Sequence, residues 1–244
     1  MQLLMGDCLE QLTELEDKSI DMVLSDAPYS GGVFATDRQK STSDKYFNPK
    51  YNGSCRFPDF DGDNMDQNSF TEFMQRVLRK ARQKSKDEAV IAIFIDWRNI
   101  VSMINALQMA GWLYKGIVVW DKGNARNIPG RFRQDCEFII WGTNGKKTVH
   151  YVKGVKSFCG CYRVKSVSTK KKHHQTEKPV ELLEELIKIC PEGGTVLDMF
   201  MGSGSTGVAC VNMDRDFIGI EEQRFYFETA TTRIEQAKAL KRIE

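Results

Sequence analysis

The sequence predicts an α/β fold built on a doubly wound, mostly parallel sheet with helices on both faces. Three observations support this prediction. Apolar, strand-like runs alternate with helical patterns along the chain, and a glycine-rich turn follows one strand and opens a helix. The length of 244 residues suits one large domain, with room for a small insert.

The elements follow from hydrophobic periodicity and from the residues that end each segment. We predict strands over residues 20–25, 89–95, 112–120, 136–141, 195–197 and 217–220. We predict helices over residues 7–15, 69–86, 98–109, 179–190, 205–212 and 223–241. Ser69 with Glu72 predicts a capping box, Gly111 closes the third helix, and Pro179 starts the fourth.

Two segments depart from this alternation. Residues 30–68 lack sustained periodicity, and a connection of that length predicts a functional, mobile loop. Residues 146–178 carry a net charge of +9 in a chain whose total is +2, which leaves −7 for the rest. A basic insert in an acidic body is typical of contact with a polyanion, although a solvated lysine-rich loop has the same composition. The candidate nucleic-acid contacts are Lys146, Lys147, Lys153, Lys156, Lys165, Lys170, Lys171 and Lys172.

Composition narrows the class of protein further. A hydrophobic content of 41% and a charged content of 28% are ordinary for a globular chain. No apolar run reaches the roughly 18 residues that span a bilayer, and the N-terminus lacks a secretion signal, so we expect a cytoplasmic protein. Seven cysteines predict reduced thiols. Zinc is an alternative for Cys159, Cys161, His173 and His174, but the cysteine spacing is not that of structural zinc, so we expect no metal.

A glycine-rich turn and an acid predict a site for a nucleotide-type cofactor. The turn DMFMGSGSTG at residues 198–207 directly follows strand 195–197. Its glycines allow close approach of the backbone, and the helix behind it offers free N–H groups. Glu221 ends the next strand, where such sheets hold ribose hydroxyls. A structural tight turn is the simpler alternative.

A second cluster, DAPY at residues 26–29, ends strand 20–25, where α/β sheets place their sites. The Asp26 carboxylate and a backbone carbonyl can accept the two N–H bonds of an exocyclic amine, while a flat ring stacks on Tyr29. The cluster therefore favours a heterocycle that carries an amine. A strand-ending turn with a capping aspartate is the alternative reading.

Together these motifs resemble those of the S-adenosylmethionine-dependent amino-DNA methyltransferases of the permuted beta group. DAPY resembles the catalytic Asp-Pro-Pro-Tyr, and LDMFMGSGST at residues 197–206 resembles Leu-Asp-Pro-Phe-x-Gly-Ser-Gly-Thr-Thr. GDCLE at residues 6–10, HHQTEKP at residues 173–179 and GIE at residues 219–221 resemble the other elements, in the same order. The resemblance thus covers both ends of the chain.

The resemblance implies a Rossmann-like sheet that binds S-adenosylmethionine and transfers its methyl group to an exocyclic nitrogen of a base in double-stranded DNA. It implies a catalytic motif made of Asp26, Ala27, Pro28 and Tyr29. In this motif Asp26 accepts a hydrogen bond from the amine, and Tyr29 stacks on the base. The base must leave the duplex to be reached. Asp7 would meet the adenine edge of the cofactor, and Thr176 and Lys178 its methionine end. The other implied cofactor-binding residues are Asp198, Phe200, Gly202, Ser203, Gly204, Ser205, Thr206 and Glu221.

The resemblance also divides the chain into parts. Residues 1–142 form the catalytic half with the mobile loop 30–68, residues 143–172 the basic target-recognition insert, and residues 173–244 the cofactor-binding half. Aspartate at position 26 favours N6 of adenine over N4 of cytosine. No proline is followed by cysteine, which disfavours methylation of the cytosine ring carbon. The group serves bacterial and phage restriction and modification, and a homodimer is consistent with it.

Two departures from the family pattern leave alternatives open. Ala27 replaces the first proline of the catalytic motif, and Met199 replaces the proline after Asp198. A weakened relative that only binds DNA or RNA is therefore one alternative, and RNA as the substrate is another. A nicotinamide-dependent dehydrogenase would share the glycine turn, but it would leave residues 26–29 and the basic insert unexplained.

Overall fold

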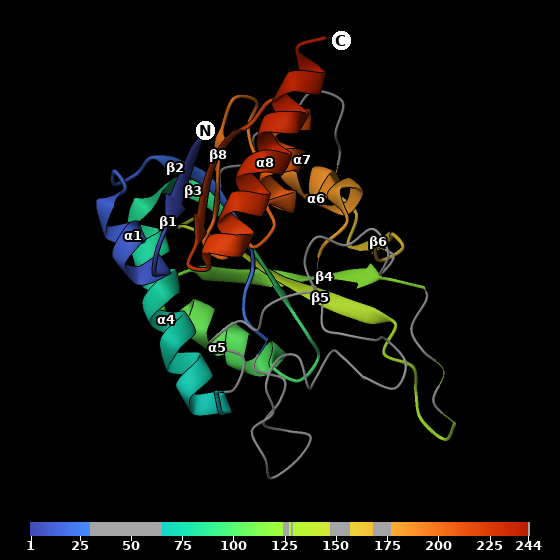
Figure 1. Ribbon diagram of the computed structural model, residues 1–244. Coiled ribbons are helices and arrows are strands. Elements are labelled where there is room, and N and C mark those ends of the chain that lie inside the picture. Colours follow the sequence, from blue (N-terminus) through green and yellow to red (C-terminus); the bar gives the residue numbers. More distant parts are fainter. Residues whose placement is uncertain (30–64, 124–126, 128, 147–156, 168–176, 244) are drawn as a thin grey trace.

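The computed structural model describes residues 1–29, 65–123, 127, 129–146, 157–167 and 177–243. Over these residues the strands form one sheet of eight, in the order β1-β8-β7-β2-β3-β5-β4-β6 (Figure 1). The strands are β1 (Gln2–Met5), β2 (Ile20–Asp26), β3 (Ser85–Ile95), β4 (Leu113–Asp121), β5 (Cys136–Thr143), β6 (Cys161–Arg163), β7 (Thr195–Asp198) and β8 (Asp216–Glu221).

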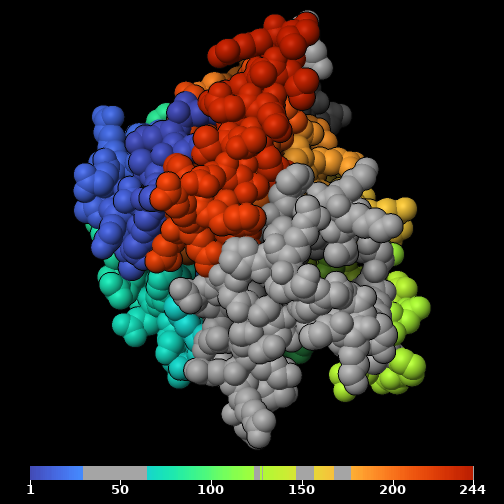
Figure 2. Space-filling view, viewed as in Figure 1, coloured from blue at the N-terminus to red at the C-terminus, as the bar shows by residue number. Residues whose placement is uncertain are grey.

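Helices cover both faces of the sheet. Their bounds are α1 (Cys8–Glu14), α4 (Gln67–Lys84), α5 (Ile100–Met109), α6 (Val180–Ile187), α7 (Ser205–Asn212) and α8 (Arg224–Lys241). Helices α1, α4 and α5 pack together on one face, and α6, α7 and α8 form the layer on the other (Figure 1). Helix α8 also contacts β1, so the first strand and the last helix lie side by side on the face that Figure 2 shows. The prediction of a doubly wound α/β fold is confirmed.

The direction and order of the strands locate the site. Within the described sheet, β5 runs antiparallel to β3 and β4, and the other neighbouring pairs are parallel. The mostly parallel character is therefore confirmed. Strands β2 and β7 are neighbours, but the chain continues from β2 to β3 on one side and from β7 to β8 on the other. This reversal of strand order opens a crevice at the carboxyl ends of β2 and β7, where such sheets bind ligands.

The start of α4 differs from the predicted capping box, which is wrong. Asp66 caps the helix, and its Oδ1 accepts from the N–H groups of Asn68 at 2.8 Å and Ser69 at 3.0 Å. The Ser69 hydroxyl donates to Asp66 Oδ2 at 2.8 Å instead of capping. Hydrogen bonds to the Ser69 and Asn68 groups lower the pKa of Asp66. A carboxylate is favoured at this position because the helix N-terminus carries partial positive charge.

Two short edge strands escape the prediction, because three or four residues carry too little periodicity to be recognised. Strand β1 pairs with β8, and β6 pairs with β4, both in parallel. Strand β6 lies inside the predicted insert 143–172, and the indole N–H of Trp120 on β4 donates to the Val164 carbonyl at 2.7 Å. The described end of the insert is thus joined to the sheet.

The remaining elements agree with their predicted ranges to within four residues at each end. Most of the core lies along the central strands: β3 is buried from Ala89 to Ile95, and β7 from Val196 to Asp198. Rigid central strands of this kind hold the residues at their tips in place. Of the helices in the described ranges, none has the length and apolar character needed to cross a membrane.

Candidate active site

A cavity of about 260 Å³ lies at the carboxyl ends of β2 and β7. The catalytic-motif residues Asp26, Ala27, Pro28 and Tyr29 line one part of it. The predicted cofactor-binding residues that line the cavity are Asp7, Lys178, Asp198, Phe200, Gly202, Ser203, Ser205, Thr206 and Glu221. Gly204 is not among the lining residues, and Thr176 lies outside the described residues. The structure therefore brings the two sequence clusters to one cavity.

Ser25 ties the two strand tips together. Its hydroxyl donates to Asp198 Oδ1 at 2.6 Å and accepts from the Met199 N–H at 3.2 Å. The register of the neighbouring strands brings these groups together, because Val23 of β2 pairs with Leu197 of β7. Ser25 is buried, so these bonds form away from water and fix β2 against the glycine turn.

Asp198 holds the glycine turn with both carboxylate oxygens. Oδ1 also accepts from the Phe200 N–H at 3.1 Å, and Oδ2 accepts from the Thr206 hydroxyl at 2.6 Å. The residue is 2% exposed, and burial raises its pKa from 3.8 to about 6 despite these hydrogen bonds. Both oxygens of the carboxylate therefore accept hydrogen bonds from the protein, and the residue holds the glycine turn against β2.

Glycines and Glu221 shape the turn further. Gly202 and Gly204 have φ angles of 52° and 81°, which side chains rarely adopt. A Cβ on Gly204 would lie 2.8 Å from the Cβ of Ala230, so this glycine serves the close packing of α7 against α8. Glu221 accepts from the Gly202 and Gln223 N–H groups, both at 2.9 Å, and burial raises its pKa.

Arg233 of α8 is a second support that the sequence motifs do not reveal. One guanidinium nitrogen donates to the Ser203 carbonyl at 2.7 Å and to the Ser203 hydroxyl at 2.9 Å. The other binds the buried carboxylate of Glu177 at 2.7 Å. Arg233 thus connects α8, the glycine turn and the segment before α6. Its sequence distance from the turn gives no pattern that would have identified it.

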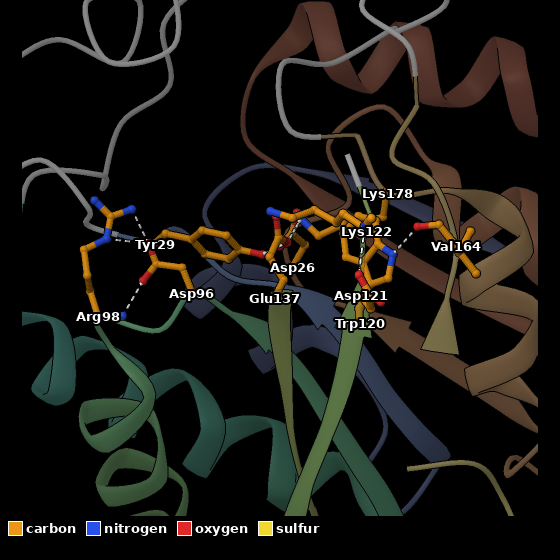
Figure 3. Close-up of polar contacts among 11 residues, drawn as sticks. Asp26, Tyr29, Asp96, Arg98, Trp120, Asp121, Lys122, Glu137, Val164 and Lys178 are labelled. Carbon is orange, nitrogen blue, oxygen red and sulfur yellow. Dashed lines mark hydrogen bonds and ion pairs between the residues drawn. The ribbon is translucent and has the colours of Figure 1, made fainter. Parts of the chain in front are cut away.

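Lys178 contacts Asp26 directly. Its Nζ donates to Asp26 Oδ2 at 2.5 Å and lies 3.6 Å from Glu137 Oε2 (Figure 3). The same ammonium lies 5.0 Å from the centroid of the Tyr29 ring and 5.3 Å from that of Phe94. Lys178 was predicted at the methionine end of the cofactor, and the structure adds this contact with Asp26, the carboxylate predicted to be catalytic.

Tyr29 is fixed at both ends. Its hydroxyl donates to Glu137 Oε2 at 3.0 Å, and its carbonyl accepts from the Asn99 side-chain amide at 2.5 Å. Glu137 Oε1 in turn accepts from Lys122 at 3.1 Å. Figure 3 shows Tyr29, Asp26, Glu137, Lys178 and Lys122 as one connected group drawn from several elements. Glu137 and Lys122 were absent from the predicted site.

Burial and charge act in opposite directions on this group. Burial raises the pKa of Asp26, and Lys178 opposes that rise. For Lys178, burial is the largest effect and lowers the pKa, but Asp26 and Glu137 together outweigh it and raise the pKa above 10.5. For Glu137, burial favours the neutral form, yet Lys178 and Lys122 together hold its pKa below 4.5. Lys178 and Glu137 are therefore charged near neutral pH.

Asp26 retains one unused acceptor. Its Oδ1 is buried and has no hydrogen-bond partner among the described residues, while Oδ2 binds Lys178. Buried carboxylate oxygens are normally hydrogen-bonded, so an unpaired one at a cavity wall calls for a donor from a ligand. An N–H group of a substrate would satisfy it.

The two predicted DNA-contacting lysines that the structure describes, Lys146 and Lys165, lie at opposite ends of the strands. Lys165 follows β6, whose last residue pairs with Asp121 at the edge where the cavity lies, and it is exposed. Lys146 follows the end of β5, where Thr143 pairs with Val90, and so lies at the opposite edge. The structure does not bring Lys146 to the cavity. The other six, Lys147, Lys153, Lys156, Lys170, Lys171 and Lys172, lie outside the described residues.

The residues weighed for zinc are described only in part. Cys159 and Cys161 are exposed free thiols, whereas His173 and His174 lie outside the described residues. Within the described ranges, no group of three or more His, Cys, Asp and Glu side chains could hold a metal ion.

Comparison with known proteins identifies the family. A family model described as DNA methylase, for the N6 and N4 amino-methyltransferases, matches residues 20–232. The Type II methyltransferase M2.LlaDCHI of Lactococcus lactis subsp. cremoris is 31% identical over 250 residues, 94% of this chain and 87% of that protein. The Type II methyltransferase M2.DpnII of Streptococcus pneumoniae is 30% identical over 256 residues, with 96% and 90% covered.

Solved structures agree with the family match. The crystal structure of the M1.HpyAVI–SAM complex has a TM-score of 0.67 and 27% identity, with 96% of this chain and 98% of that chain covered. The cytosine-N4-specific PvuII DNA methyltransferase has a TM-score of 0.71 at 16% identity, with 98% and 90% covered, and supports the fold alone. The family match spans most of the chain and includes both motifs at the cavity. The chain therefore belongs to the N6/N4 DNA methylase family and is an S-adenosylmethionine-dependent DNA methyltransferase.

Proposed function

We propose that this methyltransferase modifies the N6 amine of adenine in double-stranded DNA after the base has left the helix. The observation that carries the proposal is the unpaired Oδ1 of Asp26, which lies in the same cavity as the glycine turn. An exocyclic amine offers the N–H donor that this oxygen lacks. The base must leave the stack because a buried carboxylate cannot reach an amine inside a duplex.

The cavity suits S-adenosylmethionine by the chemistry of its lining. The carboxylates of Asp7 and Glu221 offer acceptors for the adenine edge and the ribose hydroxyls, and Phe200 supplies an apolar wall near Phe73, with ring centroids 6.3 Å apart. When bound, the cofactor supplies an electrophilic methyl group. Lys178 marks the boundary between the cofactor residues and the catalytic motif, because it contacts Asp26.

The Asp26 carboxylate can make the amine nitrogen of the base a better nucleophile. The lone pair of an exocyclic amine is delocalised into the ring, which makes the nitrogen a poor nucleophile. A hydrogen bond from the amine to Oδ1 favours a pyramidal nitrogen and stabilises the positive charge that develops on it during transfer. Tyr29 contributes the aromatic wall, and its hydroxyl is held by Glu137.

The choice of adenine is supported by the aspartate at position 26, and N4 of cytosine is the second candidate. The relatives M2.DpnII and M2.LlaDCHI are named Type II methyltransferases, which supports a role in restriction and modification in a bacterial cytoplasm. Nucleoside mass spectrometry of treated DNA distinguishes the two bases. A size measurement by light scattering tests the homodimer that the family resemblance suggests.

Lysines of the insert provide the proposed contact with DNA phosphates, and Lys165 supports it from the cavity edge of the sheet. Reversing the charge of Lys170, Lys171 and Lys172 should weaken DNA binding and flatten its dependence on salt, because fewer counterions are released. An unchanged salt slope would remove these lysines from the interface.

Transfer of labelled methyl groups to unmethylated DNA tests the proposal. We expect Asp26→Ala to abolish transfer while the dissociation constant for the cofactor stays within about threefold, because Asp26 acts on the amine. Glu221→Ala should do the reverse and weaken cofactor binding. Retained turnover in Asp26→Ala would refute the role of this carboxylate, and a wild-type protein that binds DNA without transferring label would identify a weakened relative.

A further inference from the structure

Glu137 lies outside both sequence motifs but reaches the catalytic cavity. It is the second residue of β5, which runs antiparallel to β3, so Phe138 pairs with Ile95 and Ile139 with Phe94. Phe94 in turn pairs with Asp26 of β2. The antiparallel direction therefore brings the start of β5 to the same edge of the sheet as the catalytic carboxylate.

Two carboxylates and two ammonium groups meet around Glu137. Its Oε1 lies 3.1 Å from Lys122, and its Oε2 accepts from the Tyr29 hydroxyl at 3.0 Å and lies 3.6 Å from Lys178. Lys178 donates to Asp26 at 2.5 Å. The four formal charges cancel, and both Glu137 and Lys178 are largely withdrawn from water. Charges buried in this way act strongly on one another.

We infer that Glu137 is a positioning residue for methyl transfer, which fixes Tyr29 through its hydroxyl and balances the charge of Lys178 beside Asp26. The inference rests on the proposed role of Asp26 as the acceptor of the amine. An ammonium next to Asp26 opposes a second positive charge on the amine nitrogen. Glu137 offsets that ammonium, while Lys122 keeps Glu137 ionised, so Asp26 keeps its capacity to stabilise the amine.

The titration of Asp26 and Lys178 makes the inference measurable. The charged and titratable groups around them are Glu137, Lys122, Tyr29 and Asp198. Glu137→Gln removes a negative charge, which stabilises the deprotonated forms of Asp26 and Lys178. Both pKa values fall, and we expect the acid limb of the pH–rate profile, which follows the ionisation of Asp26, to move to lower pH by roughly one unit. Lys122→Gln removes a positive charge, so the acid limb should move to higher pH.

The experiment measures the single-turnover rate of labelled methyl transfer to unmethylated DNA at saturating cofactor, across pH, in full-length protein. We expect Glu137→Gln to lower the rate roughly 10- to 100-fold, by analogy with the loss of an outer hydrogen-bond partner at a metal site. The dissociation constant for S-adenosylmethionine should stay within twofold. Tyr29→Phe should lower the rate and move the acid limb to higher pH, opposite to Glu137→Gln, because the Tyr29 hydroxyl helps to lower the pKa of Asp26. Glu192→Gln, on the exposed turn before β7, is the matched control.

The outcomes separate a positioning role from a structural one. Opposite displacements of the acid limb in Glu137→Gln and Lys122→Gln support the inference. Slower transfer by Glu137→Gln with an unmoved acid limb overturns it, and so does a rate equal to that of Glu192→Gln. In both cases transfer by the wild type leaves the proposed function intact. If Glu137→Gln fails to fold, Lys122→Gln gives the decisive result, because Lys122 lies outside the hydrophobic core and glutamine keeps most of its side chain. A wild type without transfer overturns both proposals.

Discussion

Replacing Asp198 by asparagine measures the cost of a buried carboxylate at the junction of β2 and β7. Asparagine keeps the shape of the side chain: its oxygen can accept from Ser25 and from the Phe200 N–H, and its amide can donate to the Thr206 hydroxyl. The variant should therefore fold, and it lacks only the titration of the carboxyl group.

The magnitude follows from the pKa of Asp198, which is about 6 in the folded chain against an ordinary 3.8. Because the folded protein binds this proton more tightly than the unfolded chain, the ionised group lowers the free energy of unfolding above pH 6. The cost is relieved as the pH falls toward 4. Between pH 7 and pH 4.5 the wild type should gain about 2 kcal/mol relative to Asp198→Asn.

Urea unfolding, followed by tryptophan fluorescence at several pH values, checks this result. The quantity of interest is the difference between wild type and Asp198→Asn, in which the titration of groups remote from Asp198 cancels; Asp26 and Glu221 are coupled to Asp198 by charge and add a smaller change of their own. Asp87→Asn, whose side chain is 80% exposed, is the control for the same substitution at the surface. A constant difference for Asp198→Asn, or one in which the wild type loses stability as the pH falls, would refute the reasoning.

Two further substitutions test the packing around the glycine turn, and both are checked by denaturant unfolding. Gly204→Ala places a Cβ 2.8 Å from that of Ala230 at a φ of +81°, and we expect a loss of roughly 3 kcal/mol. Gly193→Ala, with a φ of +67° and open space, isolates the backbone cost of roughly 1 kcal/mol, and equal losses would contradict the packing argument. Arg233→Met removes the cation that binds buried Glu177 and should cost roughly 3 kcal/mol, whereas wild-type stability would show that the pair contributes nothing.

The sequence supports the centre of the fold well because the strongest signals lie there. Strands 20–25 and 195–197 are apolar and end at polar motifs, and parallel neighbours bring such ends to one edge. The hydrogen bond between Ser25 and Asp198 joins the ends of these two strands, as this argument predicts. The start of α4 was mispredicted because Asp66 and Ser69 are both good capping residues, and spacing alone cannot rank them.

The direction of β5 determines which residues outside the sequence motifs reach the cavity, and the sequence does not predict that direction. Hydrophobic alternation predicts that residues 136–141 form a strand, but the pattern reads the same in either direction. A parallel β5 would place Glu137 at the edge away from Asp26 and the segment after Thr143 beside it. The antiparallel β5 does the opposite: it joins Glu137 to Lys178 and Tyr29, and it carries Lys146 away from the cavity. A residue's membership in this site is therefore a property of sheet topology, which arises from packing of the whole chain, and motifs within single segments do not encode it.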